Sequence, residues 1–146
     1  MRKSLRELAV GVALLASPAL AGEMSVSHAT LRVISPATPA AGYFDIRNLE
    51  NWPLTLVGAS SPACGSLMMH RSSTAGGMAS MRDAGAIILA PRQTVRFQPG
   101  GLHLMCMDPS PSLMSARTVP VRLLLRHYQP VDVVFTVTDA LGHPHR

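Results

Sequence analysis

Short apolar segments, separated by turn residues, make up most of the chain after residue 21. Gly42–Arg47 alternates strictly, with Phe44 and Ile46 on one face and polar or amphipathic residues on the other. A period of two is typical of a strand with one buried face. The pattern predicts nine strands: Val26–Ile34, Gly42–Arg47, Leu54–Ala59, Cys64–His70, Ala86–Leu89, Thr94–Gln98, Leu102–Met107, Val119–His127 and Val131–Thr138.

Nine short strands with Pro and Gly between them predict an all-β sandwich or barrel. No segment shows a helical stripe, and the chain contains no internal repeat. Leu123–Leu125 is a continuous apolar run, which fits a buried strand or a buried helical turn. Ser110–Ser115 suits an irregular turn, and Arg71–Arg82 is small and polar, which indicates a loop. The 146 residues are enough for one domain.

The first 21 residues have the three parts of a secretory signal peptide. Basic residues stand at positions 2, 3 and 6, Ala9–Leu15 is apolar, and Ala19–Ala21 has the small-x-small pattern that signal peptidase needs. We expect cleavage after Ala21. The apolar run is too short to span a bilayer, which takes about 20 residues, so no stable membrane insertion is expected.

The mature chain is expected to comprise a β-sandwich domain over residues 22–138 and a flexible tail over residues 139–146. Its ten Arg outnumber its seven Asp and Glu, and its only other basic side chains are His. The arginines are scattered rather than clustered, which argues against a nucleic-acid partner. We expect an exported monomer in an oxidising compartment, where cysteines can pair.

Methionine and histidine are concentrated in two stretches of the chain. Thioether, imidazole and thiolate groups are soft or borderline ligands, and together they select Cu(I) over Zn(II), Mg(II) or Ca(II). The nearest acids, Asp83 and Asp108, are single. The first stretch holds Met68, Met69, His70, Met78 and Met81, and the second holds His103, Met105, Cys106 and Met107.

Four of these residues can surround one ion. His103 and Met105 are two positions apart, so on a strand they point to the same face. His70 ends another strand, and Met81 ends the adjoining loop and can fold back toward it. Two His and two Met make a roughly tetrahedral Cu(I) shell, and a ligand on a loop lets the ion leave.

The spacing reads His70, ten residues, Met81, twenty-one residues, His103, one residue, Met105. This resembles the PCu(A)C family of periplasmic copper chaperones, whose signature is H-x10-M-x21-H-x-M. Flanking residues such as Pro99–Leu104 also look like the family. The resemblance implies a cupredoxin-like, Greek-key β-sandwich in the periplasm that binds Cu(I) at an exposed site. It also implies delivery of copper to an acceptor protein of the cytochrome c oxidase assembly pathway, usually the Cu(A) centre.

Other methionines and histidines are weaker candidates. Met78 is either a spare ligand or an exposed side chain, and Met107 is a minor candidate on the face of His103. Met68 and Met69 are expected to contribute to packing, because one of two neighbours on a strand must face inward. In the tail, His143 and His145 either form a weaker Cu(II) site or belong to a disordered end.

The sequence departs from the family's usual pattern at Cys64 and Cys106, and at Arg71, where some relatives have Met. The two cysteines form a structural disulfide, or one joins the copper shell, or the pair cycles as a redox couple. Alternation places Cys106 on the face opposite His103 and Met105, which favours the disulfide.

The alternative functions are a blue-copper electron carrier and a thiol–disulfide redox protein. Blue-copper sites use two His and one Cys with a weak axial Met, but no His follows Cys106 until His127. The cysteines lack the C-x-x-C spacing of thioredoxin-type enzymes. No catalytic triad, paired carboxylate or phosphate-binding loop is evident, so we expect a binding protein and not an enzyme.

Overall fold

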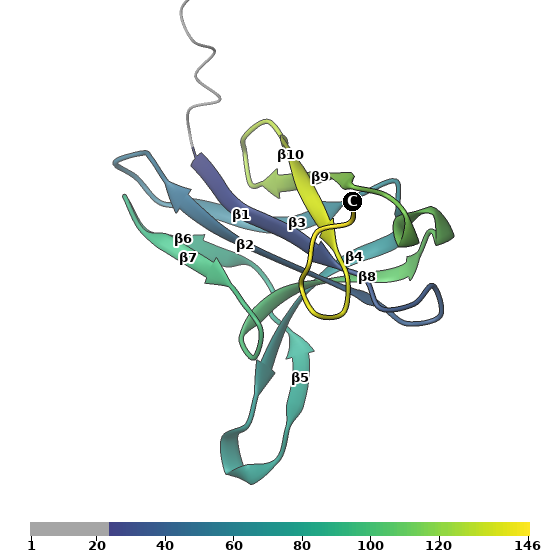
Figure 1. The fold of residues 1–146 in the computed structure, drawn as a ribbon. Coiled ribbons are helices and arrows are strands. Elements are labelled where there is room, and N and C mark those ends of the chain that lie inside the picture. The colour runs from purple at the N-terminus through teal and green to yellow at the C-terminus, as the bar shows by residue number, and fades with distance from the viewer. Residues whose placement is uncertain (1–23) are drawn as a thin grey trace, which may run out of the picture.

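The structure, a computed structural model, describes residues 24–146, which form ten β-strands and two single turns of 3-10 helix (Figure 1). The expected signal peptide and its cleavage site lie outside the described residues. The turns are η1 (Ala75–Gly77) and η2 (Pro111–Met114). The strands are β1 (Met24–Arg32), β2 (Ala40–Asn48), β3 (Leu54–Ser60), β4 (Cys64–Ser73), β5 (Ser80–Asp83), β6 (Ile87–Leu89), β7 (Thr94–Phe97), β8 (Leu102–Pro109), β9 (Thr118–Leu125) and β10 (Val131–Thr138).

The strands form one sheet that closes on itself. Its hydrogen-bonded order is β5-β4-β8-β7-β2-β1-β10-β9-β3-β6. Additional pairings join β3 to β4, through Ala59 and Leu67, and β8 to β2. Among the described strands, parallel pairing is confined to β1 with β10 and β7 with β8. The expected all-β, single-domain class is confirmed.

The core consists of the inward residues of each strand. In β9 the buried positions alternate from Val119 to Leu125, so the apolar run 123–125 belongs to a strand and not to a helix. Phe44 stacks on Phe97 with ring centroids 4.3 Å apart, and Phe135 lies 5.5 Å from Phe44. Each fully buried side chain of this size contributes about 1.5–3 kcal/mol to folding.

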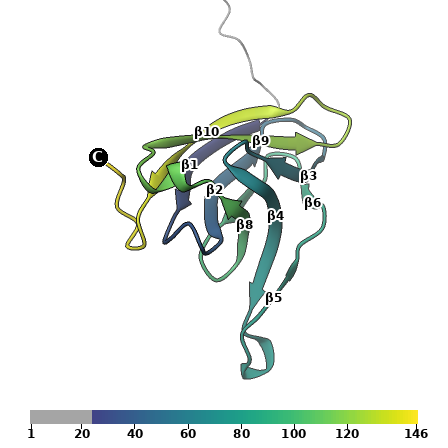
Figure 2. The same cartoon turned by 90° about the vertical axis from the view of Figure 1, so that its right-hand side faces the viewer.

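The β4–β5 hairpin projects from the barrel as an arm (Figures 1 and 2). The sequence predicted a loop over 71–82, but β4 continues to Ser73 and β5 begins at Ser80. All four residues of β5 are exposed, so the arm lacks the alternation of apolar residues that marks a half-buried strand. Gly76 and Gly77 turn the tip with φ of 74° and 75°, values that favour glycine.

Asn48 at the end of β2 is fully buried and fixes the turn that follows. Its Nδ2 donates to the carbonyls of Trp52 (2.7 Å) and Leu89 (3.0 Å), and its Oδ1 accepts from the Glu50 amide (2.8 Å). We expect Asn48→Ala to lower the free energy of unfolding by about 3 kcal/mol, because buried backbone groups lose their partners. Urea denaturation measures this. Asn51→Ala, at an exposed site, is the control, and a loss in Asn48→Ala as small as the control's would contradict the assignment.

The last eight residues fold back on the barrel. The amide of Asp139 donates to the carbonyl of His143, and that of His145 donates to Val137. The His143 amide also donates to the Asp139 carboxylate, which lowers the pKa of that carboxyl. These contacts describe one conformation, so the flexibility expected of residues 139–146 stays a prediction. Within residues 24–146, no helix has the length and apolar character needed to cross a membrane.

Candidate metal centre

Three of the candidate ligands, His70, His103 and Met105, lie on one face of β4 and β8. These strands pair antiparallel, with His70 opposite His103 and Met68 opposite Met105. Residues directly opposite each other in an antiparallel pair point to the same side of the sheet. The intervening residues Met69 and Leu104 point inward and are buried. The alternation within each strand therefore separates a His/Met face from the core.

The two imidazoles are close enough to share an ion. The ring centroids of His70 and His103 are 5.9 Å apart, and the rings meet edge to face at 87°. A metal ion lies about 2.0 Å from an imidazole nitrogen, so one ion fits between rings at this separation. The register of β4 and β8 sets this distance, so it does not depend on a mobile loop.

His103 is oriented by the backbone. Only 5% of its surface is exposed, and its Nδ1 lies 3.1 Å from the carbonyl oxygen of Gly101. That oxygen also accepts the backbone amide of Ser72 at 3.0 Å, which ties it to β4. A proton on Nδ1 leaves the lone pair on Nε2 free to bind a metal, and this is the usual way in which metal-binding histidines are held. The sequence did not reveal this contact, because the partner is a main-chain group.

Met81 reaches the site from the arm. In the register of β4 and β5, Met81 lies opposite Ser72 and Asp83 lies opposite His70. The sulfur of Met81 is 3.2 Å from Nδ1 of His70. Two ligands bonded to one ion at about 2.0 Å (N) and 2.3 Å (S) would be separated by a similar distance. Met81 is half exposed, at 50%, whereas His103 is buried.

The other methionines of the two stretches differ in position. Met105 and Met107 are half-buried on the His/Met face of β8. Met69 packs in the core as expected, but Met68 is 38% exposed, so the packing role expected for Met68 is wrong. The sequence position of Met68, two residues before His70, already indicated that it shares the face of His70, because alternate residues of a strand point to the same side. Met78 is 76% exposed next to the tip of the arm.

The tail histidines make separate contacts. His143 Nδ1 lies 3.5 Å from the Asp139 carboxylate, and His145 Nδ1 lies 2.9 Å from the carbonyl oxygen of Ala116. Within residues 24–146, no three His, Cys, Asp or Glu side chains gather where they could hold a metal ion. A shared Cu(II) site at His143 and His145 therefore stays a prediction.

Cys64 and Cys106 form a disulfide that links β4 to β8. The expected bond is confirmed, and both described cysteines are engaged in it. Cys106 is fully buried on the core side of β8, opposite the face of His103 and Met105. The alternatives in which a cysteine thiolate binds copper, including a blue-copper centre, require a free thiolate and do not agree with this structure.

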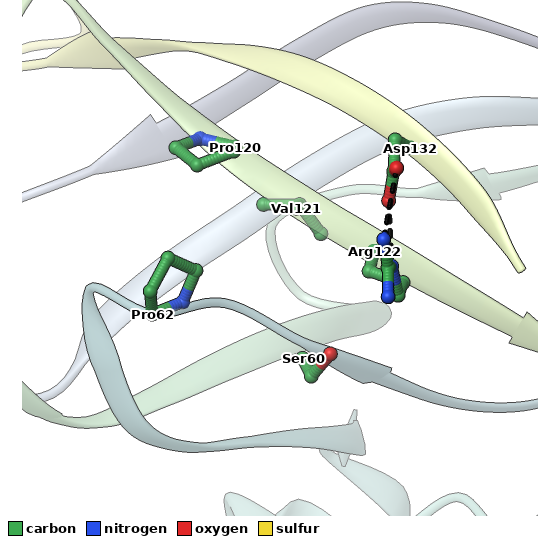
Figure 3. Close-up of a pocket in the computed structure, with 6 residues that line it drawn as sticks. All are labelled: Ser60, Pro62, Pro120, Val121, Arg122 and Asp132. Atoms are coloured by element: carbon green, nitrogen blue, oxygen red, sulfur yellow. Dashed lines mark hydrogen bonds and ion pairs between the residues drawn. The ribbon is translucent and has the colours of Figure 1, made fainter.

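A surface hollow of about 340 Å³ lies elsewhere, between the β3–β4 turn and β9 (Figure 3). Arg122 Nε donates to Asp132 Oδ1 at 2.7 Å, and Nη2 donates to Oδ2 at 3.1 Å. This ion pair lowers the pKa of Asp132 and raises that of Arg122. The two charges satisfy each other, and the lining offers no sulfur or imidazole. It consists of Ser60, Pro62, Pro120, Val121, Arg122 and Asp132.

Comparison with known proteins places the chain in a family. Residues 24–137 match the model of a family described as "Putative lipoprotein LpqE-like". The chain belongs to the LpqE-like family. One relative, "Putative lipoprotein Lxx21020" of Leifsonia xyli subsp. xyli, is 28% identical over 120 residues, which cover 82% of this chain and 72% of the relative.

Solved structures similar to this LpqE-like protein are PCuAC domains. The copper-bound PCuAC domain from PmoF2 is 25% identical with a TM-score of 0.66, over 81% of this chain and 94% of that domain. Apo-DR1885 from Deinococcus radiodurans is 26% identical with a TM-score of 0.63, over 98% of this chain and 97% of that one. Its Cu(I) form is 27% identical with a TM-score of 0.63, over 82% and 78%. The resemblance to the PCuAC family is confirmed.

Proposed function

We propose that this LpqE-like protein is an exported Cu(I) chaperone that holds one ion with His70, Met81, His103 and Met105. One observation carries the proposal: the sulfur of Met81 lies 3.2 Å from Nδ1 of His70. The register of β4 and β8 in turn places His70 opposite His103. Two imidazoles and two thioethers suit Cu(I). Two similar structures, the copper-bound PCuAC domain from PmoF2 and Cu(I)-DR1885, carry copper, which supports the same cargo.

The graded exposure of the ligands suits transfer. His103 is buried and held by Gly101, so it retains the ion longest. Met81 is half exposed on the projecting arm, so its sulfur is the donor that an acceptor's ligand can replace first. One Cu–S bond breaks as the acceptor's bond to copper forms, and the ion stays Cu(I) throughout. No general base or substrate pocket is needed, which supports a binding protein rather than an enzyme.

We further propose that the acceptor belongs to the cytochrome c oxidase assembly pathway, with the Cu(A) centre as the destination, and that the protein works in the periplasm as a monomer. The support is the match of all four ligand positions to the PCu(A)C spacing. The runner-up function, thiol–disulfide exchange, is less well supported, because Cys106 is fully buried and its sulfur is therefore shielded from an attacking thiolate.

An anaerobic Cu(I) titration of the protein purified after export, against a coloured competing chelator, tests the chaperone proposal. We expect one tightly bound Cu(I) per chain, with the same affinity before and after thiol reduction, because the disulfide lies on the other side of β8. Binding only after reduction would bring a cysteine into the copper shell. No competition in either state would overturn the proposal.

A further inference from the structure

The sheet order places a third methionine among the proposed ligands. β4 lies between β5, which carries Met81, and β8, which carries Met105. An ion bound by both of these sulfurs must therefore lie over β4. The residues of β4 that face this side are His70 and Met68, and Met68 is directly opposite Met105. Met68 is consequently on a strand nearer to the arm than Met105 is, and it is two residues from His70 on that same strand.

Met68 is also free to move. It is 38% exposed and lines a surface hollow of about 350 Å³ together with Asp83 and Ala86. This exposure leaves the sulfur accessible to an ion, and the unbranched side chain has three rotatable bonds with which to reposition it. The pairs His70–His103 and Met68–Met105 follow each other on the same face of the β4–β8 ladder, with the inward pair Met69–Leu104 between them, so they present two imidazoles and two sulfurs without any contribution from the arm.

We propose that Met68 is a third thioether ligand for the Cu(I) cargo, one that takes the place of Met81 when the arm is away from the ion and no acceptor is bound. This inference rests on the proposed function. Copper then passes from the shell His70, Met81, His103 and Met105 to the shell His70, Met68, His103 and Met105. One Cu–S bond breaks and one forms, with no change in oxidation state. The exchange keeps four ligands on the ion while Met81 is free.

Substitutions by leucine remove the sulfur and keep the size of the side chain. We expect Met81→Leu alone to lower the Cu(I) affinity by about tenfold or less, because Met68 replaces the lost ligand. Adding Met68→Leu in that background is expected to cost at least another tenfold, whereas Met68→Leu alone costs less. X-ray absorption of the Cu(I)-loaded proteins is expected to show two sulfurs in Met81→Leu and one in the double variant.

Met114 provides the matched control, since it is 42% exposed on η2 and lies outside β4, β5 and β8. Met114→Leu in the Met81→Leu background is expected to change neither the affinity nor the sulfur count. A double variant Met81→Leu/Met68→Leu that binds like Met81→Leu would overturn this inference and leave the chaperone proposal intact. A wild-type protein that binds no Cu(I) would overturn both.

Discussion

Replacing His103 by alanine is expected to lower the Cu(I) affinity more than about a hundredfold, since changes to groups that merely orient a ligand already cost about 10–100-fold. His103 is the most buried of the four proposed ligands, and Gly101 fixes its orientation. No other described imidazole is opposite His70, so the chain offers no nitrogen replacement. The measurement is a Cu(I) competition titration under anaerobic conditions.

The control for this variant is His28→Ala, which removes an exposed imidazole on β1 that contacts Asp45 instead of the His/Met face. Circular dichroism and urea denaturation of His103→Ala separate loss of a ligand from loss of the fold. A folded His103→Ala protein with wild-type affinity would show that copper binds elsewhere. The tail histidines would then be the next residues to test.

Removal of the disulfide by the double substitution Cys64→Ala/Cys106→Ala is expected to reduce the free energy of unfolding by about 4 kcal/mol. The bond spans 42 positions of sequence, and the cross-link restricts the unfolded chain in proportion to the logarithm of that length. Both residues are replaced together, because a single substitution would leave a lone thiol. Urea denaturation under oxidising conditions measures the difference.

The Cu(I) affinity of the double cysteine variant provides the control for this prediction. The double variant is expected to bind Cu(I) with wild-type affinity at temperatures where it is folded, because the bond lies on the core side of β8 and the ladder of β4 and β8 remains. A loss of stability below about 1 kcal/mol would contradict the entropic account of the bond. A large loss of affinity in the folded variant would show that the cross-link also sets the geometry of the ligands.

Alternation in the sequence was sufficient to predict most strands of the barrel. The strand spacing of His103 and Met105 predicts their common face, and the same rule places Cys106 on the opposite face, which the structure shows to be the core side of β8. The H-x10-M-x21-H-x-M spacing selects four donors that lie on paired strands. These features depend on residues close together in the chain or on a pattern of chemically distinctive residues.

Three features required the register of the sheet. β5 has no buried side chain, so its sequence reads as a loop, and only its pairing with β4 shows that Met81 is on a strand. The carbonyl of Gly101 that orients His103 is a main-chain group, so no residue type in the sequence indicates this contact. Alternation alone puts Met68 on the face of His70, but only the place of β4 between the arm and β8 brings Met68 beside the other proposed ligands.

The projecting arm also exposes its sulfurs to chemistry other than metal exchange. Oxidation of a methionine to the sulfoxide turns a soft donor into a polar, chiral group, and exposed thioethers are open to it. Met81 is half exposed and Met78 is more exposed still, whereas Met69 is protected by the core. The openness that suits hand-over therefore also leaves the empty arm sensitive to oxidants, and a Met81 sulfoxide would have to be reduced before its sulfur could again serve as a soft donor.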